Sequence, residues 1–279
     1  MNRKRLPFLI VGIVILSIFL LFSLFPQLFT NYGRKESFGV WLPISSKHIL
    51  GTNSLGYDIF TELVYGTRET LLVGLSSSIF ALILGLVIGL LASKKGIVGT
   101  IFSGICDSFT MLPRLIVLIV LSMFIGKSTI GLIVVISLFS WVGIARAVKA
   151  KVMHIYSLPF IEACKMYKYS YWHIAIRHVL PNVSDVLISK FLLGINSCIM
   201  MESTLSFLGI GNLYYPTWGV MINFARSRGA IMVGAYQYLI VPCLCIMLIS
   251  LAFYFVSIYV ERRNEVILDS ESIWWWNYV

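Results

Sequence analysis

The stretch TLLVGLSSSIFALILGLVIGLLAS, residues 70–93, contains no charged side chain and is rich in Leu, Ile and Val. A helix that crosses a lipid bilayer needs about 20 consecutive apolar residues, so this stretch is long enough to span a membrane once. A membrane β-strand would instead show about ten residues of alternating apolar and polar character. The continuous run therefore predicts a transmembrane helix. Within it, Gly85 and Gly89 stand four residues apart, a spacing that lets a second helix pack closely.

The composition of the whole chain agrees with a membrane protein. Of its 279 residues, 58% are hydrophobic and 12% are charged, and the mean hydropathy is +0.89. Soluble domains carry about 45–50% apolar and about 25% charged residues. These values exclude a disordered chain, a collagen-like fibre and an ordinary soluble enzyme.

The cysteines do not predict a metal site or a disulfide framework. Cys106, Cys198, Cys243 and Cys245 lie in or beside apolar runs, and Cys164 lies in a basic segment. No pair has the C-x2-C spacing with histidine partners that a zinc site needs. We therefore expect no bound metal and no other cofactor.

Five more apolar runs have the length of a spanning helix. They cover residues 7–29, 107–125, 128–145, 184–201 and 236–260. The first run is longer than the roughly 7–15-residue core of a signal peptide, and no small-residue cleavage site follows it, so we expect an uncleaved anchor. The sequence thus predicts an all-α integral membrane protein with six transmembrane helices.

The charges predict how these helices are oriented. The formal net charge is +10, which in a soluble protein would suggest a nucleic-acid partner. If both termini are cytoplasmic, 13 of the 22 basic residues lie inside and 7 outside, with Arg114 and Lys190 within spans. Basic residues accumulate in cytoplasmic loops of membrane proteins. The charge is therefore explained by topology, and we expect lipid but no nucleic acid as a partner.

The longest predicted cytoplasmic loop, residues 146–183, contains the sequence SLPFIEACKMYKYSYWHIAIRHVLPNV. Ser157 as N-cap and Pro159 in the first turn predict a short helix. Phe160, Ile161, Cys164 and Tyr167 then recur with the spacing of an amphipathic helix. A second short helix is expected over residues 171–179, ended by Pro181. Such a pair would present a knob to a cytosolic partner; the alternative is a basic segment that only lies on the membrane surface.

Several ionisable residues fall inside the predicted spans. Asp107 and Arg114 are seven residues apart and would share one stripe of a helix, and Glu202 opens the run ESTLSFLG, which contains Ser206. Charges within a membrane usually face a bundle interior or an aqueous path. We interpret Asp107, Arg114, Glu202 and Ser206 as candidates for a translocation pathway. The alternative is that the basic side chains extend to the interface while the acids lie at span ends.

Three ordered motifs carry a resemblance to a known family. Glu162-Ala163-Cys164, with Leu180-Pro181 further on, resembles the EAA motif of the permease subunits of binding-protein-dependent ABC importers. HILGTNSLGYD at 48–58 followed by YGTR at 65–68, and LSFLGIG at 205–211 followed by Trp218-Gly219, are similar to segments of the dipeptide, oligopeptide and nickel branch, in its second, C-type permease.

The resemblance implies a type I ABC importer permease fold of the MetI-like kind, in the cell (inner, cytoplasmic) membrane with both termini cytoplasmic. An anchor span and the start of an extracytoplasmic loop would cover residues 1–55. The permease domain would cover 56–262, with the coupling loop at about 146–183, and a cytoplasmic tail would cover 263–279.

The resemblance also implies a function and its partners. The chain would form half of a pathway for peptides, nickel or a metal chelate, beside a second homologous permease, two ABC ATPase subunits and an extracytoplasmic substrate-binding protein. The residues implied to contact an ATPase are Phe160, Glu162, Ala163, Cys164, Tyr167, Lys168, Leu180 and Pro181.

The chain itself is not expected to be an enzyme. Gly126-Lys127-Ser128 matches the end of a P-loop, but Leu121 stands where the motif needs its first glycine. An integral membrane enzyme acting on lipid would be the alternative, and it would need a cluster of catalytic His, Asp or Glu at one interface. A channel is a third alternative, and no filter motif for one is evident.

The chain departs from the family pattern at one informative position. Lys168 stands where the EAA motif has its glycine. Glycine allows a positive φ between two short helices at low cost. The lysine therefore implies either a different turn or a strained one.

Overall fold

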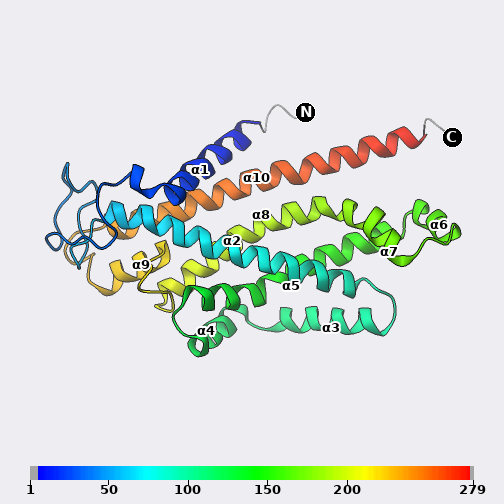
Figure 1. The fold of residues 1–279 in the computed structure, drawn as a ribbon, viewed down its shortest axis with the longest axis horizontal. Helices are drawn as coiled ribbons and strands as arrows, with labels where there is room; N and C mark the ends of the chain where they lie inside the picture. The colour runs from blue at the N-terminus through cyan, green and yellow to red at the C-terminus, as the bar shows by residue number, and fades with distance from the viewer. Residues whose placement is uncertain (1–5, 277–279) are drawn as a thin grey trace.

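The structure is a computed structural model that describes residues 6–276; the side chains at positions 163, 165, 171, 172, 185 and 261–276 are not described. Within this part of the chain the regular structure is helical, apart from two isolated β-bridges, Ser37 with Tyr57 and Thr52 with Asp58. The helices form one elongated bundle (Figure 1). The prediction of an all-α fold is confirmed.

The helices follow the predicted apolar runs. They are α1 (Leu6–Leu24), the 3-10 turn η1 (Pro26–Leu28), α2 (Ile59–Ala92), α3 (Ile97–Met111), α4 (Arg114–Ile125), α5 (Thr129–Tyr156), α6 (Pro159–Met166), α7 (Tyr171–Ile174), the π-helical turn η2 (Ala175–Val179), α8 (Leu180–Phe207), α9 (Trp218–Ser227) and α10 (Gln237–Trp276). In the described part of the chain, five helices are long and apolar enough to cross a membrane, and the bent pair α3 and α4 would make a sixth span.

Polar side chains fix where two of the long helices begin. Asp58 caps α2, because its carboxylate accepts a hydrogen bond of 2.8 Å from the amide of Thr61. Ser128 caps α5 in the same way, with the amide of Gly131 as donor at 3.0 Å. Such caps satisfy amide groups that have no partner in the first helical turn. The sharp start of α2 extends it 11 residues beyond the uncharged run at 70–93.

The third predicted span is not one straight helix. The chain breaks at Leu112 and Pro113, and the axes of α3 and α4 differ by 91°. A proline disfavours helical backbone in the residue before it, and Leu112 is accordingly extended, with ψ of 133°. Asp107 and Arg114 therefore lie on different helices, and the expectation that they share one helical stripe is wrong.

The two ends of the bundle carry different segments (Figure 1). The turn between α2 and α3, the helices α6 and α7, and the last turns of α10 lie toward one end. The loop between η1 and α2 lies at the other end, together with α9. We call these the α6 end and the α9 end.

Helix α2 is the centre of the bundle and packs most extensively against α5 and α8. Gly85 and Gly89 make the contact with α5 possible, as their spacing predicts. A Cβ atom added at Gly85 would lie 2.7 Å from the Cβ of Ile144, and one at Gly89 would lie 2.7 Å from the carbonyl oxygen of Ala145. Any side chain at these two positions would force the helices apart.

Candidate functional site

The loop between α5 and α8 forms a compact helical unit at the α6 end. Pro159 begins α6, as predicted, but Ser157 has a different role from the expected N-cap. It is the last residue of α5's C-terminal turn, where its hydroxyl donates to the carbonyl of His154 at 2.7 Å. Only Leu158 then separates this residue from α6, so the position of α6 is set directly by the end of α5.

One face of α6 is buried and the other is free. The side chain of Ile161 is fully buried and packs in a cluster that also contains Ile174 and Val179 of the following helical segment. Glu162 is exposed, and 79% of Tyr167 is accessible. The apolar stripe expected from the sequence is divided between the two faces, because Ile161 is buried whereas Phe160 and Tyr167 are exposed. The anchored face holds the helix on the bundle while the exposed face is available to a partner.

Lys168 was expected to form either a different turn from that of glycine or a strained one, and the structure shows the strained turn. Lys168 has φ of 58°, in the left-handed region, and the amide of Tyr169 donates to the carbonyl of Cys164 at 3.2 Å. This is the hydrogen bond of a Schellman-type helix end, which glycine usually supports. The lysine thus adopts the backbone conformation that a glycine would adopt, at an energetic cost that glycine avoids.

The second short helix does not end at Pro181. Helix α7 passes into η2 and then directly into α8, so the chain from Tyr171 to Phe207 is one helical rod. The amide of Leu180 donates to the carbonyl of Ala175, five residues back, as a π-turn does. A proline normally breaks a helix because it lacks an amide donor and its ring clashes with the preceding turn. The π-turn before Pro181 widens the helix there, so the rod continues and joins α6 to a transmembrane helix.

Next to this rod lies an open hollow of about 670 Å³. Its wall includes Cys164, Tyr169, His173 and Arg177. The rings of Tyr169 and His173 are stacked, with centroids 4.6 Å apart. The hollow and the exposed face of α6 together form one surface at the α6 end, with Phe160 partly exposed beside it.

The candidates for a pathway in α3 and α4 both contact α5. Asp107 forms an ion pair of 2.6 Å with Arg146, and both side chains are well exposed. Arg114 donates from Nη2 to the hydroxyl of Ser140 at 2.7 Å, while its Nε is buried with no partner among the described residues. Each charged residue therefore fixes one half of the bent pair to the same neighbouring helix.

The other two candidates are buried inside the subunit. Glu202 and Ser206 are both fully buried on one face of α8. The Glu202 carboxylate accepts hydrogen bonds from the hydroxyls of Ser206, Thr217 and Ser203, at 2.5, 2.7 and 3.3 Å. Burial of a carboxylate is costly unless hydrogen-bond donors surround it, and three do so here. The structure places Glu202 in a contact between α8 and α9.

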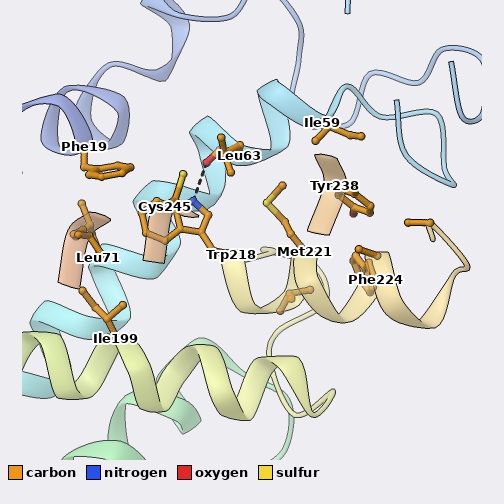
Figure 2. Packing of buried hydrophobic residues seen from close by; sticks show 14 of the residues in the cluster. Phe19, Ile59, Leu63, Leu71, Ile199, Trp218, Met221, Phe224, Tyr238 and Cys245 are labelled. Carbon is orange, nitrogen blue, oxygen red and sulfur yellow. Dashed lines mark hydrogen bonds between the residues drawn. The ribbon is translucent and has the colours of Figure 1, made fainter. Parts of the chain in front are cut away.

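Thr217, which sequence analysis had not singled out, completes this contact together with the Trp218-Gly219 pair of the third motif. Thr217 is the N-cap of α9 as well as a donor to Glu202. The amide of Trp218 donates to the hydroxyl of Thr70 at 3.1 Å, and its indole Nε1 donates to the carbonyl of Leu63 at 3.2 Å (Figure 2). A Cβ atom at Gly219 would lie 2.7 Å from the backbone of Ser203. The Trp218-Gly219 pair was the only signal in the sequence for this docking.

A second buried polar cluster lies at the α9 end. Glu62 of α2 is buried, and its Oε2 accepts hydrogen bonds from the amide of Asn53 at 2.9 Å and from the hydroxyl of Tyr238 at 3.0 Å. His48 and Asp58 form a buried pair of 2.9 Å in the same loop. These contacts tie the loop before α2 to both α2 and α10. Sequence analysis had not singled out Glu62.

Comparison with known proteins places this bundle in a family. The family described as "Binding-protein-dependent transport system inner membrane component" matches residues 81–266, which is more than half of the chain. The chain therefore belongs to this family. Its members are transport components, so this chain is a multi-pass inner-membrane permease and not an enzyme.

Two curated relatives and one solved structure narrow the comparison. The chain is 35% identical over 211 residues to a glutathione transport system permease protein of Pectobacterium atrosepticum, which covers 75% of this chain and 69% of that protein. It is 33% identical over 214 residues to a dipeptide transport system permease protein of Bacillus subtilis, covering 76% of this chain and 66% of that protein. The recognition of a peptide-type permease is confirmed.

The structural comparison concerns the fold. An inward-facing structure of the MetNI methionine ABC transporter matches with a TM-score of 0.54 at 20% identity, over 72% of this chain and 97% of that chain. The predicted MetI-like fold is confirmed.

Proposed function

We propose that this chain is the second permease of an ABC importer for small peptides. Two of its relatives are named for glutathione and dipeptide transport, and both of these substrates are short peptides. Neither relative is named for nickel or a metal chelate. The lipid-acting enzyme considered above finds no support in the family or in these relatives.

The observation that carries the coupling role is the construction of α6. Phe160 and Glu162 are exposed on α6 and Tyr167 is exposed in the turn directly after it, while Ile161 is fully buried in the bundle. A force applied to α6 by an ATPase would pass to α5 through Leu158 and to α8 through the continuous rod from Tyr171 onward. Nucleotide binding can shift such a unit only through contacts that differ between two states.

In this proposal the α6 end is cytoplasmic. The turn after α2, with Lys94 and Lys95, lies at this end together with α6 and the last turns of α10 (Figure 1). Two ATPase subunits would bind here, one on this chain and one on a second homologous permease. The substrate-binding protein would meet the α9 end. We keep residues 1–55 as anchor and loop, 56–262 as permease domain and 263–279 as tail.

The pathway residues remain part of the proposal in two groups. Asp107 and Arg114 would act at the surface of the bent pair, where the second permease would face them. Glu202 and Ser206 would act by fixing α9 on α8, since both are buried in this conformation.

Reconstitution tests the proposed function. The chain is placed in liposomes with the partner permease, its ATPases and its binding protein, and uptake of radiolabelled dipeptides, glutathione, nickel and a nickel chelate is measured. Uptake of peptides that requires ATP and the binding protein is expected. If nickel or its chelate is taken up and the peptides are not, the chain is a permease for metal. Activity on lipid would contradict the importer class. A Glu162→Lys complex serves as the uncoupled control.

A further inference from the structure

A cavity of about 290 Å³ lies at the α9 end, beside the polar cluster of Glu62. The loop before α2, the first turns of α2, the segment between α8 and α9, and the end of α9 form its wall. The side chains that determine its chemistry are those of Arg34, Lys35, Glu62, Tyr65, Tyr214 and Arg228. Its cations come from segments far apart in the sequence, which the fold brings together.

The cavity has an excess of positive charge. Three cations line it, and Glu62 is its one carboxylate. That carboxylate already accepts hydrogen bonds from Asn53 and Tyr238. Among the described side chains, neither Lys35 nor Arg228 has a carboxylate within ion-pair distance. Glu62 offsets part of the charge of Arg34 and Arg228 through Coulombic attraction. An anionic group entering the cavity would still find more cations than carboxylates among the side chains that line it.

Arg34 adds hydrogen-bond donors that have no acceptor. Its Nη1 faces Glu69 at 3.3 Å, whereas Nε and Nη2 are buried with no partner in the described part of the chain. These two nitrogens form one edge of the guanidinium, and such an edge matches the two oxygens of a carboxylate. The ring of Tyr215 packs on the guanidinium at 4.7 Å and is half exposed.

Aromatic side chains hold the other cations in place. Arg228 lies over the ring of Phe224 at 3.8 Å, and Lys35 lies 5.9 Å from the ring centre of Tyr214. Cations can be stabilised by ring faces without being neutralised. Apolar walls with a few charged groups at fixed positions are typical of small-molecule sites.

We propose that this cavity binds the carboxylate of a small peptide before the peptide enters the translocation pathway. The peptide and the outer location rest on the proposed function; the preference for a carboxylate rests on the cavity alone. The volume suits one or two residues and not a folded partner, which favours the substrate over an acidic side chain of the binding protein.

Direct binding to the assembled importer tests this site. The complex in lipid nanodiscs, without its binding protein, is titrated with dialanine and with dialanine amide, and binding is followed by saturation-transfer NMR. Dialanine should bind, and the amide should bind at least fivefold more weakly. Arg228→Gln and Lys35→Gln should each weaken dialanine binding at least threefold. Arg226→Gln is the matched control, because Arg226 lies in the last turn of α9 two residues before Arg228, lies over Phe207, and does not line the cavity.

Two binding results would overturn the proposal. If dialanine amide binds as tightly as dialanine, the cavity does not recognise a carboxylate. The same conclusion follows if both variants bind dialanine as tightly as the unmodified complex. Absent dialanine binding, with a weaker affinity of the variants for the peptide-free binding protein, would assign the cations to protein docking. The failure of this site can be distinguished from the failure of the proposed function. Dialanine binding without any peptide uptake would support the site and contradict the proposed function. Peptide uptake without dialanine binding would support the proposed function and contradict the site.

Discussion

The Glu202 carboxylate on α8 accepts a hydrogen bond of 2.7 Å from the Thr217 hydroxyl at the first turn of α9. The same hydroxyl accepts a hydrogen bond from the amide of Val220 at 3.3 Å. One threonine therefore both starts α9 and holds it on a transmembrane helix. Because the carboxylate is fully buried, losing this donor would leave part of its charge without a partner.

Thr217→Val tests this contact. Loss of a hydrogen bond to a buried charged group costs about 1–3 kcal/mol, and loss of an N-cap costs about 1 kcal/mol. We expect the unfolding temperature of the purified subunit in detergent to fall by several degrees. Thr204→Val on α8 is the matched control, since the Thr204 hydroxyl donates only to the backbone of its own helix. Equal effects of the two variants would contradict the role of Glu202 in docking α9.

The glycine contacts between α2 and α5 give a second prediction. Gly85→Ala should destabilise the bundle, because its Cβ would lie 2.7 Å from the side chain of Ile144 and 2.9 Å from the carbonyl oxygen of Trp141. Forced overpacking of this kind costs about 1–3 kcal/mol. Gly143→Ala on α5 meets no atom within 4 Å and should be neutral or stabilising by about 0.5–1 kcal/mol. Thermal unfolding followed by circular dichroism measures both; a stabilising Gly85→Ala would disprove the close contact.

How much the sequence reveals differs between these two features. The Gly85 and Gly89 pair was visible because helical spacing is local, and the uncharged runs located the spans for the same reason. The Glu202 contact was not visible, since Thr217 follows an irregular segment whose path depends on the whole bundle. Sequence reasoning identified Glu202 as a costly intramembrane charge but could not tell that hydroxyl groups, and not water or a partner, surround it.

The errors in the coupling loop have a similar origin. Serine often begins a helix and proline often ends one, so Ser157 was predicted as an N-cap and Pro181 as a helix end. In the fold, Ser157 ends α5 and Pro181 lies within a continuous rod, because a π-turn before the proline removes the clash. The bend at Pro113 was missed for the opposite reason: an apolar run on both sides of the proline favoured one span over the local break.

The strained turn at Lys168 gives a third prediction. Lys168→Gly should relieve a left-handed conformation that costs an L-residue about 1–2 kcal/mol, partly offset by the greater freedom of glycine in the unfolded chain. Hydrogen exchange across residues 157–175 should therefore slow by about two- to fivefold. Lys168→Ile should accelerate it, because a β-branched residue tolerates positive φ least. If both variants exchange at the wild-type rate, the turn does not adopt this conformation.

Glu162→Lys gives a fourth prediction, on coupling. The side chain is exposed on the free face of α6, so its replacement should leave folding and membrane insertion unchanged. If this face contacts an ATPase, charge reversal should reduce binding-protein-stimulated uptake at least tenfold while the basal ATPase rate persists. Size-exclusion chromatography of the assembled complex checks that insertion is intact. Normal uptake by this variant would exclude Glu162 from the coupling contact.

Crosslinking gives a fifth prediction, which tests both the docking surface and the topology. Tyr167 at the α6 end and Tyr214 at the α9 end are similarly exposed, at 79% and 74%, but they lie at opposite ends of the bundle. In a complex otherwise without accessible cysteines, Tyr167→Cys should crosslink to an ATPase subunit and react only with thiol reagents that cross the membrane. Tyr214→Cys should not crosslink to an ATPase and should react with impermeant reagents added outside. Since the two sites differ in little but their end of the molecule, an ATPase crosslink from Tyr214→Cys would invert the proposed topology. If Tyr167→Cys forms no crosslink in any nucleotide state, the segment around α6 does not contact the ATPase. The thiol labelling alone would then decide the orientation of the chain in the membrane.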